Sequence, residues 1–126
     1  MGYDLHITRK EHWSDKIAND IPLPEWLALV QSDPDMRLDG FAEATTSNGD
    51  VIRIESDGLS VWTAHSGHIE GRNMARFDFH HGCVVVKNPD EKIRRKMHQM
   101  AQRLRAKVQG DDGEYYGPDG QPEPEQ

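Results

Sequence analysis

Strand-like runs separated by turn signals fill the middle of the chain, and this pattern restricts the fold more than any other feature. Asn48-Gly49 lies between two such runs, and Asn-Gly is the strongest short-range signal for a hairpin because a type I′ turn needs positive φ at both central residues. Alternation of apolar and polar residues, or a short apolar run, predicts each strand. The expected strands are 3–8, 41–47, 50–55, 59–64, 74–79, 83–86 and 106–109.

Two helices flank this strand-rich region. The first is expected at about 24–32, where Pro24 suits a first helical turn and Asp33-Pro34 ends the helix. The second is expected to follow Asn88, which would cap the helix with Pro89 at the first helical position. Its apolar residues follow one helical face: Ile93, Met97, Met100, Ala101 and Leu104.

The predicted order of elements is β-α-β-β-β-β-β-α-β. Helices separated by a run of hairpins indicate an α+β fold, here an antiparallel sheet of about five to seven strands with two helices packed on one face. This single domain is expected to span residues 1–116. Residues 117–126 are rich in Gly, Pro and acids, so we expect a disordered acidic tail.

Composition excludes several classes of protein. The longest apolar runs fall far short of the ~20 residues that a membrane helix needs, and the first residues do not form a secretory signal. A single cysteine, Cys83, cannot form an intramolecular disulfide or a cysteine-based zinc cluster. The net charge of -7 argues against general, charge-driven binding of nucleic acid. A cytoplasmic location is therefore expected.

Histidines are the first candidates for chemistry. Asp4 and His6 share one face of the first strand, and a carboxylate beside an imidazole is the raw material of general-base catalysis. His65 and His68 share one short loop and could supply two of the three or four ligands that zinc requires. No fixed-spacing metal motif is present, so we predict no metal or cofactor and keep a small metal-dependent enzyme as an alternative.

The second helix and its C-terminal flank form the most basic segment, 92–107. This segment contains no acid, and its face could be solvated, be covered by the acidic tail, or contact an acidic protein or RNA backbone. RNA contact is the second alternative function. The cations are Lys92, Arg94, Arg95, Lys96, Arg103, Arg105 and Lys107.

Acidic residues outside that helix suit a basic protein partner, because complementary charge steers association. Trp13 lies in a polar connector and could clamp that loop or offer a binding contact. The residues expected to bind a partner are Trp13, Asp33, Asp35, Asp39, Asp111, Asp112 and Glu114.

Several blocks of the sequence resemble those of a family of small uncharacterised bacterial proteins. They are YDLHITR at 3–9, PEW at 24–26, LSVWT at 59–63, VKNPD at 86–90 and AKVQGD at 106–111. The resemblance covers about residues 3–116 and implies a bacterial cytoplasmic α+β protein, with no catalytic residue to carry over. In size, charge and organisation the chain is also similar to immunity proteins that neutralise interbacterial toxins.

These observations favour a non-enzymatic protein-binding module, an immunity-like or antitoxin-like protein that neutralises a bacterial toxin. The alternatives are the metal-dependent enzyme and the RNA-binding helix. No membrane partner is expected.

Overall fold

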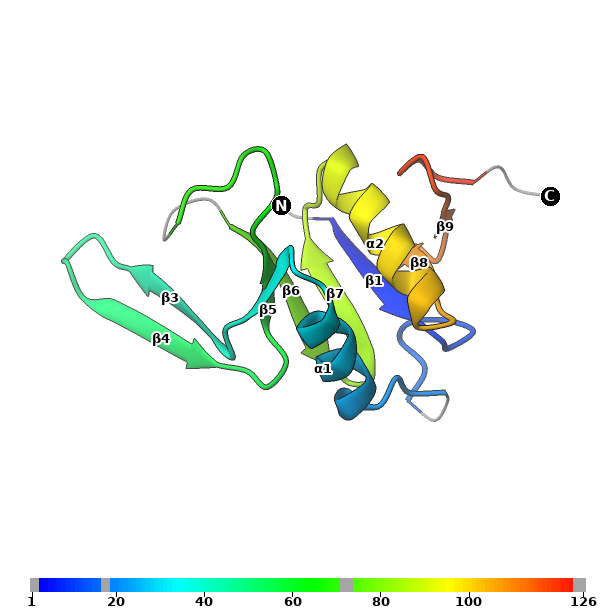
Figure 1. Cartoon of the computed structure of the whole chain (residues 1–126), viewed down its shortest axis with the longest axis horizontal. Helices are drawn as coiled ribbons and strands as arrows, with labels where there is room; N and C mark the ends of the chain where they lie inside the picture. Colours follow the sequence, from blue (N-terminus) through cyan, green and yellow to red (C-terminus); the bar gives the residue numbers. More distant parts are fainter. Residues whose placement is uncertain (1–2, 17–18, 71–73, 124–126) are drawn as a thin grey trace.

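The computed structural model describes residues 3–16, 19–70 and 74–123 and shows an α+β fold (Figure 1). Seven strands form one sheet in the order β2-β5-β6-β7-β1-β8-β9, and β3 and β4 form a separate two-stranded sheet. All described strand pairs are antiparallel, as predicted. The elements are β1 (Asp4–Thr8), α1 (Leu23–Ser32), β2 (Met36–Leu38), β3 (Phe41–Thr45), β4 (Val51–Glu55), β5 (Ser60–Trp62), β6 (Ala75–His80), β7 (Cys83–Lys87), α2 (Glu91–Arg103), β8 (Lys107–Gly110) and β9 (Tyr115–Tyr116).

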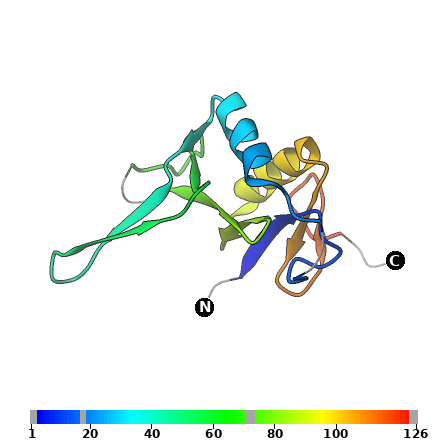
Figure 2. The same ribbon diagram turned by 90° about the horizontal axis from the view of Figure 1, so that it is seen from below.

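Both helices cover the same face of the seven-stranded sheet, which confirms the predicted arrangement (Figure 2). Trp26 of α1 is fully buried, and its indole Nε1 donates to the Gly58 carbonyl at 2.7 Å. The apolar face predicted for the second helix is buried along its length. Burial of these side chains against the sheet is the main stabilising contribution to this core. The sheet contributes Leu5, Ile7, Ala75, Phe77, Val84, Val86 and Val108 to it.

The start of α2 differs from the sequence-based expectation by two residues. Asp90 caps the helix, because its Oδ1 accepts the Ile93 N–H at 2.8 Å. Asn88 has a φ of 48° and instead accepts the Tyr3 N–H through its side chain at 2.8 Å. The predicted capping residue therefore ties the end of β7 to the start of β1.

The tight two-residue turn expected at Asn48-Gly49 is found instead at His81-Gly82. Asn48-Gly49 does connect a hairpin, but only Gly49 has positive φ, and Thr46 N–H donates to the Asp50 carbonyl at 2.7 Å across a wider loop. His81 and Gly82 both have positive φ, at 49° and 73°, and form the two-residue connection between β6 and β7. Positive φ at both positions is what a type I′ turn requires, and His81-Gly82 meets this requirement whereas Asn48-Gly49 does not.

The structure differs from the expectation of a disordered tail over residues 117–123. Tyr116 bridges to Pro122, and the Gly120 carbonyl accepts from Arg94 Nε at 2.6 Å. The Asp119 carbonyl accepts from Arg95 at 3.3 Å, so this segment folds over part of the basic helix, one of the arrangements that the sequence suggested. Residues 124–126 of the predicted tail lie outside the described residues.

Among the described residues, no helix is long and apolar enough to cross a membrane.

Candidate protein-binding groove

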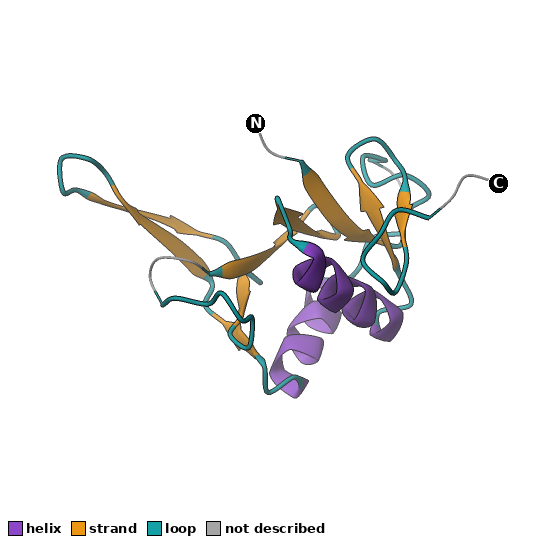
Figure 3. Cartoon of the chain, turned by 90° about the horizontal axis from the view of Figure 1, so that it is seen from above, coloured by secondary structure: helices purple, strands orange, loops and turns teal. Residues whose placement is uncertain are grey.

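A two-stranded arm, residues 41–55, projects away from the seven-stranded sheet (Figures 1 and 3). It carries three of the exposed large apolar residues of the described chain: Val51 is 61% exposed, Ile52 50% and Ile54 64%. An isolated two-stranded hairpin is at best marginally stable in water, and clustered apolar exposure on a small protein marks an interaction site. The arm is therefore the strongest candidate for a docking element.

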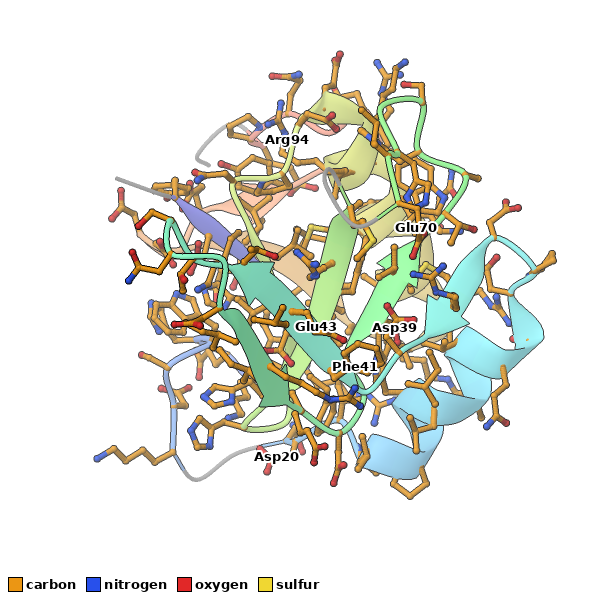
Figure 4. The ribbon with its side chains drawn as sticks, turned by 90° about the vertical axis from the view of Figure 1, so that its left-hand side faces the viewer. Asp20, Asp39, Phe41, Glu43, Glu70 and Arg94 are labelled. Atoms are coloured by element: carbon orange, nitrogen blue, oxygen red, sulfur yellow. The ribbon has the colours of Figure 1, made fainter. Side chains whose placement is uncertain are left out.

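The two faces of the arm differ in chemistry. The register pairs Ala42 with Ile54 and Ala44 with Ile52, so these four side chains form one apolar stripe. On the opposite face, Arg53 lies 3.8 Å from the centre of the Phe41 ring. Its guanidinium also pairs with Glu43 at 3.6 Å. Phe41 and Glu43 lie in front of the sheet in Figure 4, which views the molecule from the side of the arm. The stripe consists of apolar side chains alone, whereas the opposite face combines charged side chains with Phe41 and Val51.

An open groove of about 1320 Å³ lies between the base of the arm and the sheet face that the helices leave uncovered. Ala42 and Ile54 of the stripe line one wall, and β6 and β7 contribute Arg76, Asp78 and Val85. Ser56 Oγ donates to Asp78 Oδ1 at 2.7 Å, which ties the end of the arm to β6. The groove and the stripe thus form one continuous surface.

Trp13 also lines the groove. Its indole stacks on His6 with ring centroids 4.0 Å apart and an interplanar angle of 3°, and its Nε1 donates to the Asp111 carbonyl at 3.2 Å. Its backbone N–H donates to Gln109 Oε1 at 2.7 Å. The sequence left open whether Trp13 clamps its loop or offers a contact. In the structure Trp13 clamps its loop, and it also lines the groove.

His6 pairs with a carboxylate other than the one that the sequence suggested. Its Nε2 lies 2.9 Å from Asp111 Oδ1, while Asp111 Oδ2 accepts the Asp4 N–H at 2.9 Å. His6 is only 5% exposed, and its imidazole lies flat against the Trp13 indole. Asp111 therefore joins β1 to the end of β8, and Asp4 contributes its backbone rather than a general-base carboxylate to this cluster.

The two loop histidines bind different carboxylates. His65 Nε2 lies 2.7 Å from Asp90 and His68 Nε2 lies 3.0 Å from Glu70. Within residues 3–16, 19–70 and 74–123, no group of three His, Cys, Asp or Glu side chains is placed to hold a metal ion. The alternative of a metal-dependent enzyme thus gains no assembled site in the described chain.

Three of the acids expected to bind a partner lie around α1 and β2. Asp33 is buried and pairs with Lys96 at 2.6 Å. Asp39 accepts two hydrogen bonds from Arg37, at 2.6 and 3.1 Å, and lies near the base of the arm in Figure 4. Asp35 is exposed. Of these, only Asp35 presents its carboxylate freely to solvent.

The other expected acids lie beyond β8. Glu114 accepts hydrogen bonds from the Tyr3 hydroxyl at 2.5 Å and from the Tyr116 hydroxyl at 3.0 Å. Burial is the larger cause and the hydrogen bond to Glu114 the next, and together they raise the pKa of each tyrosine to about 12. Asp112 is exposed, and its N–H donates to the Tyr3 hydroxyl at 3.1 Å. Most of the expected partner-binding acids thus stabilise the fold itself.

The basic segment is partly occupied by contacts within the chain. Lys92 donates to Ser66 Oγ at 2.8 Å, Arg103 to Ser32 Oγ at 2.7 Å, and Lys107 lies 5.4 Å from the Tyr115 ring. Together with Lys96 and the two arginines held by 119–120, most of its cations already have partners. Less free positive charge remains for RNA than the sequence suggests.

Sequence reasoning did not identify Ile52 and Ile54 as candidate site residues. Alternating apolar residues predict a strand with one buried face, and that alternation is present in 50–55. A strand pattern does not reveal whether its hairpin joins the main sheet. A two-residue turn at Asn48-Gly49 would pair Ala44 with Arg53, so the observed pairing of Ala42 and Ala44 with these isoleucines could not be predicted from the expected turn.

In comparisons with known proteins, no family model matches the chain, and neither a curated protein nor a solved structure gives a significant match. The resemblance to a bacterial family stays a prediction.

Proposed function

We propose that this protein is a non-enzymatic binding module that grips another protein between its arm and the open face of its sheet. The observation that carries the proposal is the half-exposed apolar stripe, Ala42, Ala44, Ile52 and Ile54, continuous with a groove large enough for an extended segment. A few well-packed side chains near the centre of an interface provide most of its binding energy.

Charge around the stripe favours a basic partner. Residues 41–57 contain four acids, Glu43, Asp50, Glu55 and Asp57, against one arginine, Arg53, which is already paired with Glu43. A basic surface with an apolar centre would complement this rim, and opposite charges would speed the encounter. The net charge of -7 supports the same choice.

An acidic surface that binds a basic protein is consistent with an immunity-like or antitoxin-like role. In that role the arm would cover a functional surface of a toxin in the cytoplasm. The proposal rests on the exposed stripe and the charge of its rim, together with the similarity in size and charge to immunity proteins.

The test is affinity capture of the tagged protein from a lysate of the source organism, with nuclease added, followed by measurement of the Kd for the purified partner. The variant Ile52→Asp/Ile54→Asp removes the stripe. About half of each side chain remains to be buried by a partner. Full burial of an isoleucine side chain contributes roughly 2 kcal/mol, so burying the exposed half of two such side chains contributes roughly 2 kcal/mol in total. Loss of this binding free energy corresponds to about a 30-fold rise in Kd.

Tyr115→Asp is the matched control, because Tyr115 is 41% exposed on β9 at the opposite edge of the sheet. It should bind as the unaltered protein does, and thermal melting should show that both variants fold. Equal affinity of the arm variant would refute the proposal. Light scattering of the purified protein tests a second copy as the occupant, since a dimer that the arm variant dissociates would show self-association instead.

A further inference from the structure

Arg76 lies at the floor of the groove. It lies on β6 between Ala75 and Phe77, which face the core, and its own side chain lines the groove on the opposite face. Its Nε is buried and has no hydrogen-bond partner. In the described part of the chain, no carboxylate lies within ion-pair distance of its guanidinium.

Every other arginine or lysine that is at least partly buried in the described ranges has a partner. Lys10 donates to the His81 carbonyl at 2.8 Å, and Arg37 binds Glu70 through two hydrogen bonds of 3.0 Å. The remaining members of this group are Arg9 with Glu25, Arg94 with Gly120, Lys96 with Asp33 and Lys107 with the Tyr115 ring. A buried N–H without an acceptor is costly, so Arg76 is the exception that requires an explanation.

The neighbours of Arg76 do not supply the missing acceptor. Val61 lies opposite it on β5 and is fully buried. Asp78 follows it by two residues on the same face, but Asp78 accepts from Ser56 and ties down the arm. Leu59 and Ile54 add apolar walls to the same groove. The Arg76 side chain therefore lines a partly apolar space without an acceptor for its Nε among the described residues.

We propose that Arg76 binds a carboxylate of the segment that occupies the groove, either an Asp or Glu side chain or a free C-terminus. A guanidinium offers planar, paired N–H donors that match the two oxygens of a carboxylate. The acids that line the same groove, Asp4, Asp78 and Asp111 among them, disfavour a phosphate, which carries more negative charge. The lining contains six acids and four cations, and a carboxylate bound to Arg76 at the floor would fix the position of a bound segment. This inference rests on the proposed function, because it assumes that a segment enters the groove.

The test observes the Arg76 side chain directly. The full chain is labelled with ¹⁵N, and its arginine Nε–H signals are recorded by NMR, with the Arg76 signal assigned from its loss in Arg76→Gln. Three probes are titrated to about 10 mM, a range suited to weak complexes: acetyl-Lys-Ile-Val with a free carboxylate, the same peptide as its amide, and acetyl-Lys-Glu-Val amide. Inorganic phosphate is a fourth probe.

A saturable shift of the Arg76 signal with acetyl-Lys-Ile-Val or with acetyl-Lys-Glu-Val amide would support the inference, provided that acetyl-Lys-Ile-Val amide, which has no carboxylate, causes no shift. The two carboxylate peptides distinguish a chain end from a side chain. In Arg76→Gln, backbone shifts of groove residues should need at least tenfold more peptide, while Arg105→Gln, at an exposed arginine beyond α2, should behave as the unaltered protein. The inference would be overturned by equal shifts with acetyl-Lys-Ile-Val and its amide, by a shift with phosphate alone, or by no shift with any probe.

The two proposals fail in different ways. If a partner that requires the arm is captured but no carboxylate peptide shifts the Arg76 signal, the proposed binding module is supported and the carboxylate site is refuted. If the carboxylate peptides shift the Arg76 signal but Ile52→Asp/Ile54→Asp binds every captured protein with unchanged Kd, the carboxylate site is supported and the proposed docking through the arm is refuted.

Discussion

Asp33→Ala should destabilise the fold by about 3 kcal/mol, because it leaves the Lys96 ammonium buried without its partner. The sequence suggests Asp33 as a residue for binding a partner, whereas the structure places it between α1 and α2. Its Oδ2 lies 2.6 Å from Lys96 Nζ, and its Oδ1 accepts the Asp35 N–H at 2.9 Å. The predicted loss therefore distinguishes a structural carboxylate from a surface one.

The magnitude follows from burial. The Asp33 side chain is 9% exposed and the Lys96 side chain 11%. Breaking a buried ion pair by removing one partner costs roughly 3–5 kcal/mol. Lys96 retains slight access to water and a contact with the Trp62 ring at 5.8 Å, so the lower end of that range applies.

Urea unfolding followed by circular dichroism measures this loss, with the slope of the transition checked for each variant. Asp35→Ala is the control, because Asp35 is exposed two residues away and should change the free energy of unfolding by less than about 0.5 kcal/mol. The double variant Asp33→Leu/Lys96→Met removes both charges and should recover much of the stability. A loss below about 1 kcal/mol in Asp33→Ala would show that the pair is not buried in solution.

Three further predictions concern stability. The free energy of unfolding should fall as the pH drops below about 4: desolvation raises the pKa of Asp33 and Asp90, but the hydrogen bonds that they accept and nearby cations lower it by more, so both favour the folded state only while ionised. Constant stability down to pH 2 in a urea series would contradict this. Tyr3 and Tyr116 have pKa values raised to about 12, so they should stabilise the fold below pH 10 and cease to do so as the pH rises toward 12; ultraviolet titration that showed both ionising near pH 10 in folded protein would be inconsistent. Gly82→Ala should cost about 1–2 kcal/mol by thermal unfolding, because φ is 73° and the added Cβ would lie 2.5 Å from a carboxyl carbon; an unchanged melting temperature would count against the tight turn.

Local sequence signals predicted the helices and strands well, but they predicted poorly which strands pair and which distant side chains contact each other. The apolar face of α2, from Ile93 to Leu104, is buried as expected because helical periodicity depends only on neighbouring residues. The placement of Asn88 depends on Tyr3, which is 85 residues away, and a local capping pattern cannot detect such a contact. Strand order has the same limitation, since β1 lies between β7 and β8.

The candidate site was harder to predict than the fold. Asn48-Gly49 correctly indicated a hairpin, but no local feature shows that this hairpin leaves the sheet and exposes Ile52 and Ile54. The sequence likewise singled out His6 for its chemistry, yet its carboxylate partner, Asp111, comes from the far end of the chain. Surfaces and nonlocal pairs are set by tertiary packing, which one sequence specifies only indirectly.

The central claim is that the arm is the element that grips a partner. The most direct test is amide hydrogen exchange of the protein alone and in the purified complex, resolved to peptides that cover 41–55 and α2. Alone, the arm should exchange rapidly, because it is a two-stranded hairpin exposed along its length. In the complex, exchange across 41–55 should slow markedly while α2 stays unchanged. A complex in which 41–55 exchanges as fast as in the free protein would contradict the claim.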